Sequence, residues 1–248
     1  MFEFDFSLMQ WVLLVICAVF VGMSKVGIAG ISMFYIPVLA LIFGGKPSTG
    51  ILLPMLMMAD IFGVAYYHRH TEWKYLFKLL PWAFVGIGIG LWAGRVVNDE
   101  WFKNIIAFLV FAGVGTMLWR EKQKGTDFFP HTWWFAAIMG VLGGFATMIG
   151  NVAGPIFAIY MLAMNLPKNA FIGTGAWFFL IVNFSKFPLQ VWVWNNIGWK
   201  TIIIDLIMLP AIALGAFLGI WIVRKIPDKA YRTFIIIVTV LSAFLLLI

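Results

Sequence analysis

Long apolar segments separated by short polar clusters run through the whole chain. Eight segments are present, at about residues 8–45, 49–66, 75–94, 101–119, 132–165, 170–185, 200–223 and 231–248. Nearly all of the Lys, Arg, Asp and Glu lie in the clusters between them. Apolar blocks of this kind are typical of helices in lipid, whereas the strands of a membrane barrel alternate apolar and polar residues. The pattern therefore predicts an all-α, polytopic helical membrane protein.

Two of these segments have an unusual length. Segment 8–45 holds about 38 residues and segment 132–165 about 34, whereas one crossing takes about 20 residues and two take about 40 plus a turn. Each segment has a helix-weakening break near its middle, Ser24–Gly30 in one and Gly150–Pro155 in the other. We expect each segment to form a broken helix or a helical hairpin, which gives about ten helical elements.

The two halves of the chain match each other at nearly constant spacing. The matched positions are Gly50 with Gly173 and Asp60 with Asn183, both 123 residues apart, and Ala29-Gly30 with Ala153-Gly154, 124 residues apart. We interpret 1–248 as one transmembrane domain made of an internal repeat 1–119, a linker 120–131 and a second repeat 132–248.

The distribution of Lys and Arg favours hairpins over single crossings. If each long segment crosses once, the basic residues other than Lys25 divide eight against eight between the two sides; with hairpins they divide eleven against five. The positive-inside rule therefore selects the hairpin topology, with inverted repeats and both termini on the periplasmic side of a bacterial inner membrane. In transporters this arrangement places the substrate site at the midplane.

Composition narrows the class of protein further. The residues are 63% hydrophobic and 11% charged, with a mean hydropathy of +1.00, which excludes a soluble globular domain. The net charge of +7 does not indicate nucleic-acid binding, because the basic residues flank apolar segments. The N-terminus begins with acidic residues, Glu3 and Asp5, and is interpreted as mature chain rather than a signal peptide.

Motifs for metal, cofactor or catalysis are not found in the sequence. Cys17 is the single cysteine, and His68, His70 and His131 lack the spacing of a metal site. The sequence also lacks a Walker loop, a Ser-His-Asp set and an HExxH motif. We therefore expect no catalytic residues, no metal and no cofactor, and neither an ATP-driven pump nor a protease.

The first break carries a charge inside an apolar segment. Lys25 would cost at least about 2.5 to 3.5 kcal/mol there without water, a partner or a ligand. The backbone amides of Gly27, Ile28, Ala29 and Gly30, at the start of the following helix, add donors for an anion. The alternative is a lysine at a short cytoplasmic turn that only sets topology.

The second break offers neutral groups at the matching place. Thr147, Gly150, Asn151, Ala153 and Gly154 complete a site with Lys25 if the two tips meet. One positive charge among neutral donors suits a small oxyanion, and replacement of Lys25 by Met is expected to abolish binding and leave folding intact. The alternative is a seam of small residues that only packs helices.

Four further polar residues are candidates for coupling or for the substrate pathway. Asp60 is interpreted as a proton carrier or as the ion partner of Lys25, unless water reaches it at the interface. Asn183 is its repeat equivalent, and nearby Ser185 and Lys186 are candidates for an outer entrance, although a lysine that ends a span usually only reaches toward the interface. Asp205 is interpreted as interfacial.

The motifs around the two breaks resemble those of the TauE/SafE family of sulfite exporters. The stretch Val21–Gly30 through Pro37 and its echo Gly150–Pro155 carry the resemblance, which extends over almost the whole chain in length and duplicated layout. The resemblance implies a secondary carrier of sulfite or related sulfur compounds, driven by a proton or substrate gradient. It supports the breaks around Lys25 and Asn151 as the site, with Asp60 and Asn183 beside them.

These observations together predict a secondary transporter of a small anion, sulfite or a related sulfur oxyanion or organosulfonate, that works by alternating access. Its expected partners are the substrate, protons and the lipid bilayer, without nucleic acid. A membrane scaffold and a membrane enzyme are the alternatives. The sequence leaves open the exact substrate, the direction of transport, the coupling ion and the oligomeric state.

Overall fold

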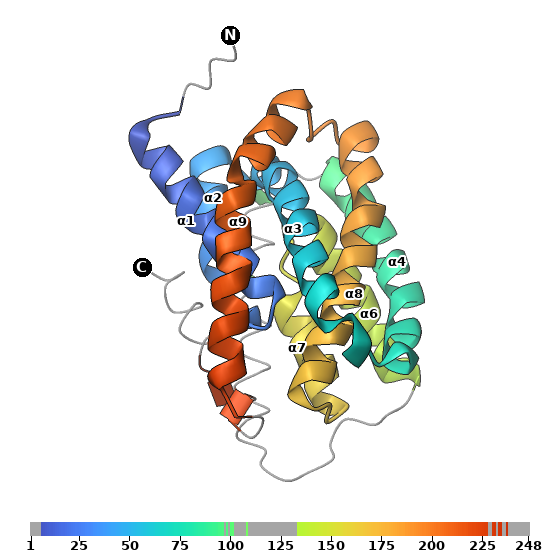
Figure 1. Cartoon of the computed structure of the whole chain (residues 1–248). Helices are drawn as coiled ribbons and strands as arrows, with labels where there is room; N and C mark the ends of the chain where they lie inside the picture. Colours follow the sequence, from blue (N-terminus) through green and yellow to red (C-terminus); the bar gives the residue numbers. More distant parts are fainter. Residues whose placement is uncertain are drawn as a thin grey trace.

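The computed structural model of the chain is a bundle of helices (Figure 1). It describes residues 6–96 and 133–227, together with 98, 100–101, 108, 230–231, 233–234 and 237. Within these residues there are eight α-helices and no strand, and six helices are long and apolar enough to cross a membrane. The prediction of a polytopic helical membrane protein is confirmed. The expected linker 120–131 and nearly all of segments 101–119 and 231–248 lie outside the described residues, so the repeat boundaries stay a prediction.

Within each of the two long described stretches, 6–96 and 133–227, the helices follow one another with short connections. They are α1 (Leu8–Lys25), α2 (Ser32–Phe43), α3 (Gly45–Tyr67), α4 (Trp73–Val96), α6 (Trp133–Gly150), α7 (Gly154–Ala163), α8 (Lys168–Pro188) and α9 (Trp199–Lys225). Two 3-10 turns, η1 (Ala29–Ile31) and η2 (His68–His70), follow α1 and α3, and a π-helical turn, η3 (Leu189–Val193), extends α8.

Each long apolar segment forms a helical hairpin. The ring of Phe6, just before α1, lies 5.3 Å from the ring of Phe43 at the end of α2, so both legs of the first hairpin meet the same end of the bundle (Figure 1). Phe135 near the start of α6 lies 5.9 Å from Tyr160 near the end of α7, which gives the second hairpin the same form. The first hairpin enters from the end that holds the start of α3, and the second enters from the opposite end.

The returning legs are too short to cross a bilayer. α2 has 12 residues and α7 has 10, which correspond to about 18 and 15 Å at about 1.5 Å per residue, against a hydrocarbon core of about 30 Å. α1 and α6 have 18 residues each. The tips of the hairpins therefore end inside the bundle.

Both tips turn at a residue with positive φ. Gly27 has a φ of 123° and follows the last turn of α1, and the amide of Ile28 donates to the carbonyl of Met23 at 3.3 Å. This is the usual way in which a helix ends at glycine. At the second tip Asn151 has a φ of 57°, a conformation that asparagine tolerates better than most residues. Pro155 then starts α7, where its missing N–H is not needed.

Two pairs of parallel helices pack through the same contacts in the two halves. In the α4–α6 pair, Gly86 lies against the backbone of Val141, and Gly144 lies against that of Ala83. In the α1–α9 pair, Gly215 lies against the backbone of Val19, and Gly22 against that of Ile212. The positions of α9 lie 129 residues after those of α4, and the positions of α6 lie 122 residues after those of α1. Such reciprocal contacts are those expected of two halves related by a two-fold axis.

The spacing of 129 residues also aligns the sequences of α4 and α9. The matched pairs are Leu80 with Leu209, Pro81 with Pro210, Gly86 with Gly215, Gly90 with Gly219, Trp92 with Trp221 and Arg95 with Arg224. The spacing of 123 residues that relates α3 to α8 does not predict this match, because the offset between α4 and α9 is different.

The glycines of these pairs are expected to set the distance between the helices. Replacing Gly86 with Ala is expected to lower the melting temperature in detergent, since the added Cβ would clash with the backbone carbonyl of Val141, and overpacking of this kind typically costs about 1 to 3 kcal/mol. Gly88→Ala is the control on the same helix, because nothing lies within 4 Å of a Cβ added there. Equal melting temperatures for the two variants would contradict this role.

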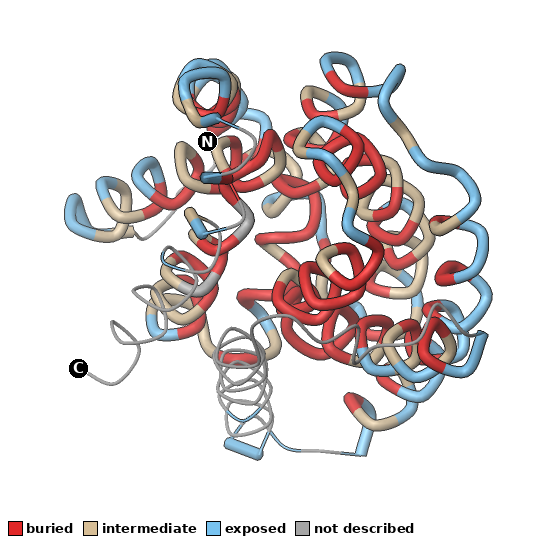
Figure 2. Tube along the Cα trace, turned by 90° about the horizontal axis from the view of Figure 1, so that it is seen from below, coloured by how far each residue is buried: buried red, intermediate tan, exposed pale blue. Residues whose placement is uncertain are grey.

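Buried residues concentrate in the middle of the bundle, and exposed ones face outward (Figure 2). The outward apolar side chains include aromatic residues near helix ends, such as Trp73, Trp133, Trp192 and Trp199, which agrees with an interfacial belt. Several buried polar side chains lie at the hairpin tips or contact them from α3 and α8, among them Thr147, Asn151 and Lys186.

Candidate functional site

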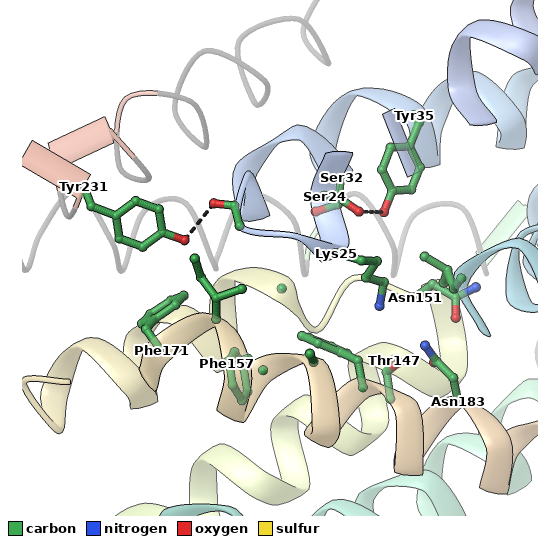
Figure 3. Close-up of a pocket in the computed structure, with 17 residues that line it drawn as sticks. Ser24, Lys25, Ser32, Tyr35, Thr147, Asn151, Phe157, Phe171, Asn183 and Tyr231 are labelled. Atoms are coloured by element: carbon green, nitrogen blue, oxygen red, sulfur yellow. Dashed lines mark hydrogen bonds between the residues drawn. The ribbon is translucent and has the colours of Figure 1, made fainter. Parts of the chain in front are cut away.

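A cavity lies where the two hairpin tips approach α3 and α8 (Figure 3). Its volume is about 60 Å³, which is room for roughly four to six water molecules at about 10–15 Å³ each. Both tips, α3 and α8 all contribute to its wall. Its polar lining residues are Ser24, Lys25, Ser32, Tyr35, Thr147, Asn151, Asn183 and Tyr231.

Lys25 is paired with a carboxylate. Its Nζ lies 2.9 Å from Oδ1 of Asp60 in the middle of α3, and the side chains are 9% and 0% exposed. The Nδ2 of Asn183 donates to Oδ2 of Asp60 at 2.6 Å. The ion pair anticipated as one role of Asp60 is therefore present, and the solvated interfacial position considered for this residue is not, because Asp60 is fully buried.

Lys186 is a second buried lysine at the same site. Its Nζ donates to Oγ1 of Thr147 at 2.8 Å, to the carbonyl of Thr147 at 3.0 Å and to Oδ1 of Asn151 at 2.7 Å, all at the second hairpin tip. Its side chain is 0% exposed, and all three acceptors are neutral. No carboxylate forms an ion pair with it in the part of the chain that the structure describes.

This position differs from the outer entrance expected for Ser185 and Lys186. The helix does not end at Lys186, because α8 continues to Pro188 and the π-helical turn extends it to Val193. Lys186 thus lies inside the span and faces the second tip. Ser185 is half-buried, and its hydroxyl donates to the carbonyl of Val182 within its own helix.

The site therefore has more basic than acidic side chains. When all groups are ionised, Lys25 and Lys186 contribute two ammoniums against the one carboxylate of Asp60. The sequence predicts one fixed charge at this site, that of Lys25, and the structure adds Lys186. Thr147 accepts from Lys186, so its own hydroxyl hydrogen is available to other acceptors. Such an excess of charge among hydroxyl and amide groups suits an anion.

A polar network borders the cavity toward the start of α3. Asn151 donates to the carbonyl of Thr49 at 3.4 Å, and the hydroxyl of Thr49 accepts from Gln190 at 3.4 Å and from Asn196 at 3.1 Å. Asn196 also donates to the carbonyl of Lys46 at 2.7 Å and to Gln190 at 2.9 Å. Gln190 is only 1% exposed, so this network occupies the space between the second tip and that end of the bundle.

At the other end, an aromatic group borders the cavity. The hydroxyl of Tyr231 donates to the carbonyl of Gly27 at 2.7 Å (Figure 3). Phe157 and Phe171 lie near it, with ring centroids 6.1 Å apart, and Phe179 lies 4.1 Å from the Nζ of Lys25. The cavity thus has a polar part beside α6 and an aromatic part beside Tyr231.

The structure brings most of the predicted site residues together. Lys25, Gly27, Thr147, Asn151, Gly154 and Asn183 line the cavity, and Asp60 contacts two of them. Gly150 and Ala153 lie next to lining residues in the chain, and Gly30 lies two residues before the lining residue Ser32. The side chain of Ala29 lies outside what the structure describes. Whether these residues bind a substrate stays a prediction.

Several lining residues gave no signal in the sequence. Tyr35 lies in an apolar run, yet its hydroxyl is 3.2 Å from that of Ser24 (Figure 3).

Other polar residues considered from the sequence lie away from the cavity. Asp205, interpreted as interfacial, is fully buried in α9 and does not line the cavity. His68 and His70 are exposed in η2, away from the cavity, and His131 lies outside the described residues.

Comparison with known proteins identifies the family. The family model described as Sulfite exporter TauE/SafE matches residues 14–246. The chain belongs to the TauE/SafE family. No curated protein matches the chain, and no solved structure does.

Members of the TauE/SafE family are membrane transporters, so the chain is a transporter and not an enzyme. The match includes both hairpins and all six of the apolar helices, apart from the first residues of α1. The protein therefore crosses the membrane several times, and its partners are the lipid bilayer and a small anionic substrate.

Proposed function

We propose that this TauE/SafE protein carries sulfite, or a related sulfur oxyanion or organosulfonate, across the bacterial inner membrane. The anion occupies the cavity between the two hairpin tips. Thr147 and Asn151 contact it from the second tip, Lys25 from the first, and Asn183 from α8. Asp60 already neutralises the charge of Lys25. Lys186, which lies behind the second tip, therefore supplies the positive charge that attracts the anion.

The observation that carries this proposal is the environment of Lys186. A buried ammonium is costly in a membrane protein unless a charge or a set of polar groups compensates it. Lys186 has three neutral acceptors and no carboxylate among the described residues. An anion in the adjacent cavity would supply the missing negative charge.

Alternating access provides the transport step. The Thr49–Gln190–Asn196 network borders the site on one side and the Tyr231–Gly27 hydrogen bond on the other. Opening one while the other stays closed would expose the anion to one side of the membrane at a time. The cycle is driven by a proton or substrate gradient, with the start of α3 on the periplasmic side as the Lys and Arg distribution predicts.

Thermal stabilisation of the purified protein tests the substrate assignment. Sulfite, sulfate, thiosulfate and sulfoacetate as sodium salts, and taurine, which is a zwitterion near pH 7, are compared at equal ionic strength, with sodium chloride as the control. A bound anion at about 100 times its Kd is expected to stabilise the protein by about 2.7 kcal/mol. Stabilisation by a sulfur anion, followed by its exchange in proteoliposomes, supports the proposal. No stabilisation and no exchange with any of the five compounds would overturn it.

A further inference from the structure

Asp205 of α9 is a buried carboxylate for which the proposed site has no use. Its side chain is 0% exposed, and neither of its oxygens accepts or donates a hydrogen bond within the described part of the chain. An ionised carboxylate in such a place is far more costly than a neutral carboxylic acid. The surroundings therefore favour the protonated form in this conformation.

The other half of the protein shows that packing does not require an acid here. At the spacing of 129 residues that relates α4 to α9, Asp205 corresponds to Leu76. Leu76 is also 0% exposed, and the helix pairs that contain the two residues pack through equivalent glycine contacts. A leucine thus fills this place in one half, and the carboxyl group in the other half adds chemistry rather than packing.

We propose that Asp205 is the proton-binding site that couples anion transport to the proton gradient. This rests on the proposed transport function. Asp205 lies six residues after the first residue of α9, Trp199, which is exposed, or about 9 Å along the helix at about 1.5 Å per residue. This end of α9 lies beside the start of α3, since Gly50 lies against Asn196, and it is the end from which a proton has the shorter way along α9 to Asp205. One proton enters from that side, is held on the carboxyl group, and leaves to water on the other side after the conformational change.

The position of α9 links this proton to the anion site. α9 packs against both α1 and α3, the helices that carry Lys25 and Asp60. The titratable side chains on the described parts of these two helices are Cys17, Lys25, Lys46, Asp60, Tyr66 and Tyr67. None of them forms an ion pair or a hydrogen bond with Asp205. The protonation of Asp205 thus affects the anion site through helix packing. Loss of the proton leaves a charge in the buried interface of α9 with α1 and α3, which makes this arrangement of the helices unfavourable.

Asp60, the other buried carboxylate, is less suited to this role. It already holds Lys25 and Asn183 at 2.9 and 2.6 Å, so its proton would have to displace an ion pair. Asp205 has no such partner to lose.

Proteoliposomes with an internal pH dye test the coupling. Sulfoacetate and thiosulfate serve as probes, since both stay ionised near pH 7 and carry no proton of their own. The wild-type protein is expected to move protons when a gradient of one of these anions is imposed, and to exchange the labelled anion at equal pH on both sides. Asp205→Asn is expected to keep the exchange within about twofold and to lose the proton movement. Asp205→Glu is expected to restore it.

A second measurement is independent of transport. Infrared spectra of the purified wild-type protein and of Asp205→Asn are recorded at pH 7 and subtracted. The difference is expected to show the carbonyl band of a protonated carboxylic acid that is present in the wild type and absent from the variant. Asp205→Leu, which copies Leu76, is the folding control and is expected to melt no lower than the wild type.

The outcomes separate the two proposals. Proton movement by Asp205→Asn at the wild-type rate, or a missing infrared band, would overturn the role of Asp205 and leave the anion transporter intact. Exchange of neither anion by the wild-type protein would overturn transport of these anions and the coupling role with it. Loss of exchange together with proton movement in Asp205→Asn would also overturn the coupling role, since it would make Asp205 essential for transport itself.

Discussion

Replacing Lys25 with Met is expected to lower the stability of the protein by about 3 to 5 kcal/mol. The substitution removes one partner of a buried ion pair, whose N–O distance is 2.9 Å, and leaves the carboxylate of Asp60 without its counter-charge. Breaking a buried pair in this way typically costs that amount. The expectation from sequence, that Lys25→Met leaves folding intact, is therefore revised, because the sequence did not establish the pair.

The double variant Lys25→Met/Asp60→Asn provides the control. With both charges removed, the melting temperature is expected to recover most of the loss, since replacing both members of a buried pair is often nearly neutral. Melting curves of the wild type, the two single variants and the double variant form a complete cycle. Additive losses in this cycle would show that the two side chains do not interact in the folded protein.

Replacing Lys186 with Gln is expected to weaken anion binding by tenfold to a hundredfold. Gln can still donate to Thr147 or Asn151, so the change removes the charge while retaining a donor to the second tip. Interactions that involve a charged group are worth about 1.5 to 3 kcal/mol, and about 1.4 kcal/mol corresponds to a factor of ten in Kd.

The affinity of the Gln variant for sulfite and the other test anions is read from the concentration dependence of thermal stabilisation. Lys200→Gln is the matched control, because Lys200 is exposed at the start of α9 and its loss is expected to leave affinity unchanged. Wild-type affinity in Lys186→Gln would show that the charge of Lys186 does not act on the bound anion.

The sequence indicated the hairpins and the main residues of the candidate site for physical reasons. Gly27 and Asn151 stand out because a break at the centre of a helix in lipid leaves backbone polar groups without hydrogen bonds unless other parts of the protein supply partners. Asp60 stands out because a carboxylate in an apolar segment is costly. Both signals are local, so they are visible without knowledge of the tertiary contacts.

Lys186 was misplaced because its environment is not local. A lysine near the end of an apolar segment usually lies at the membrane surface. The sequence does not reveal that α8 continues through a π-helical turn, or that the α6–α7 tip reaches Lys186 with three acceptors. Asp205 was misplaced for the same reason. Nearby Lys200 suggested an interfacial ion partner, whereas the packing of α9 against α1 and α3 buries Asp205 away from water.

The hydrogen bond between Asp60 and Asn183 joins two positions that are separated by the repeat spacing of 123 residues. A position that contacts its own equivalent lies on the axis that relates the two halves. If the halves were two identical subunits of a dimer, the same side chain would lie on both sides of this axis. Two carboxylates at 2.6 Å could not both be ionised, and two asparagines would leave Lys25 without a counter-charge. Joining the halves in one polypeptide lets an acid face an amide across the axis, which no dimer of identical halves can achieve.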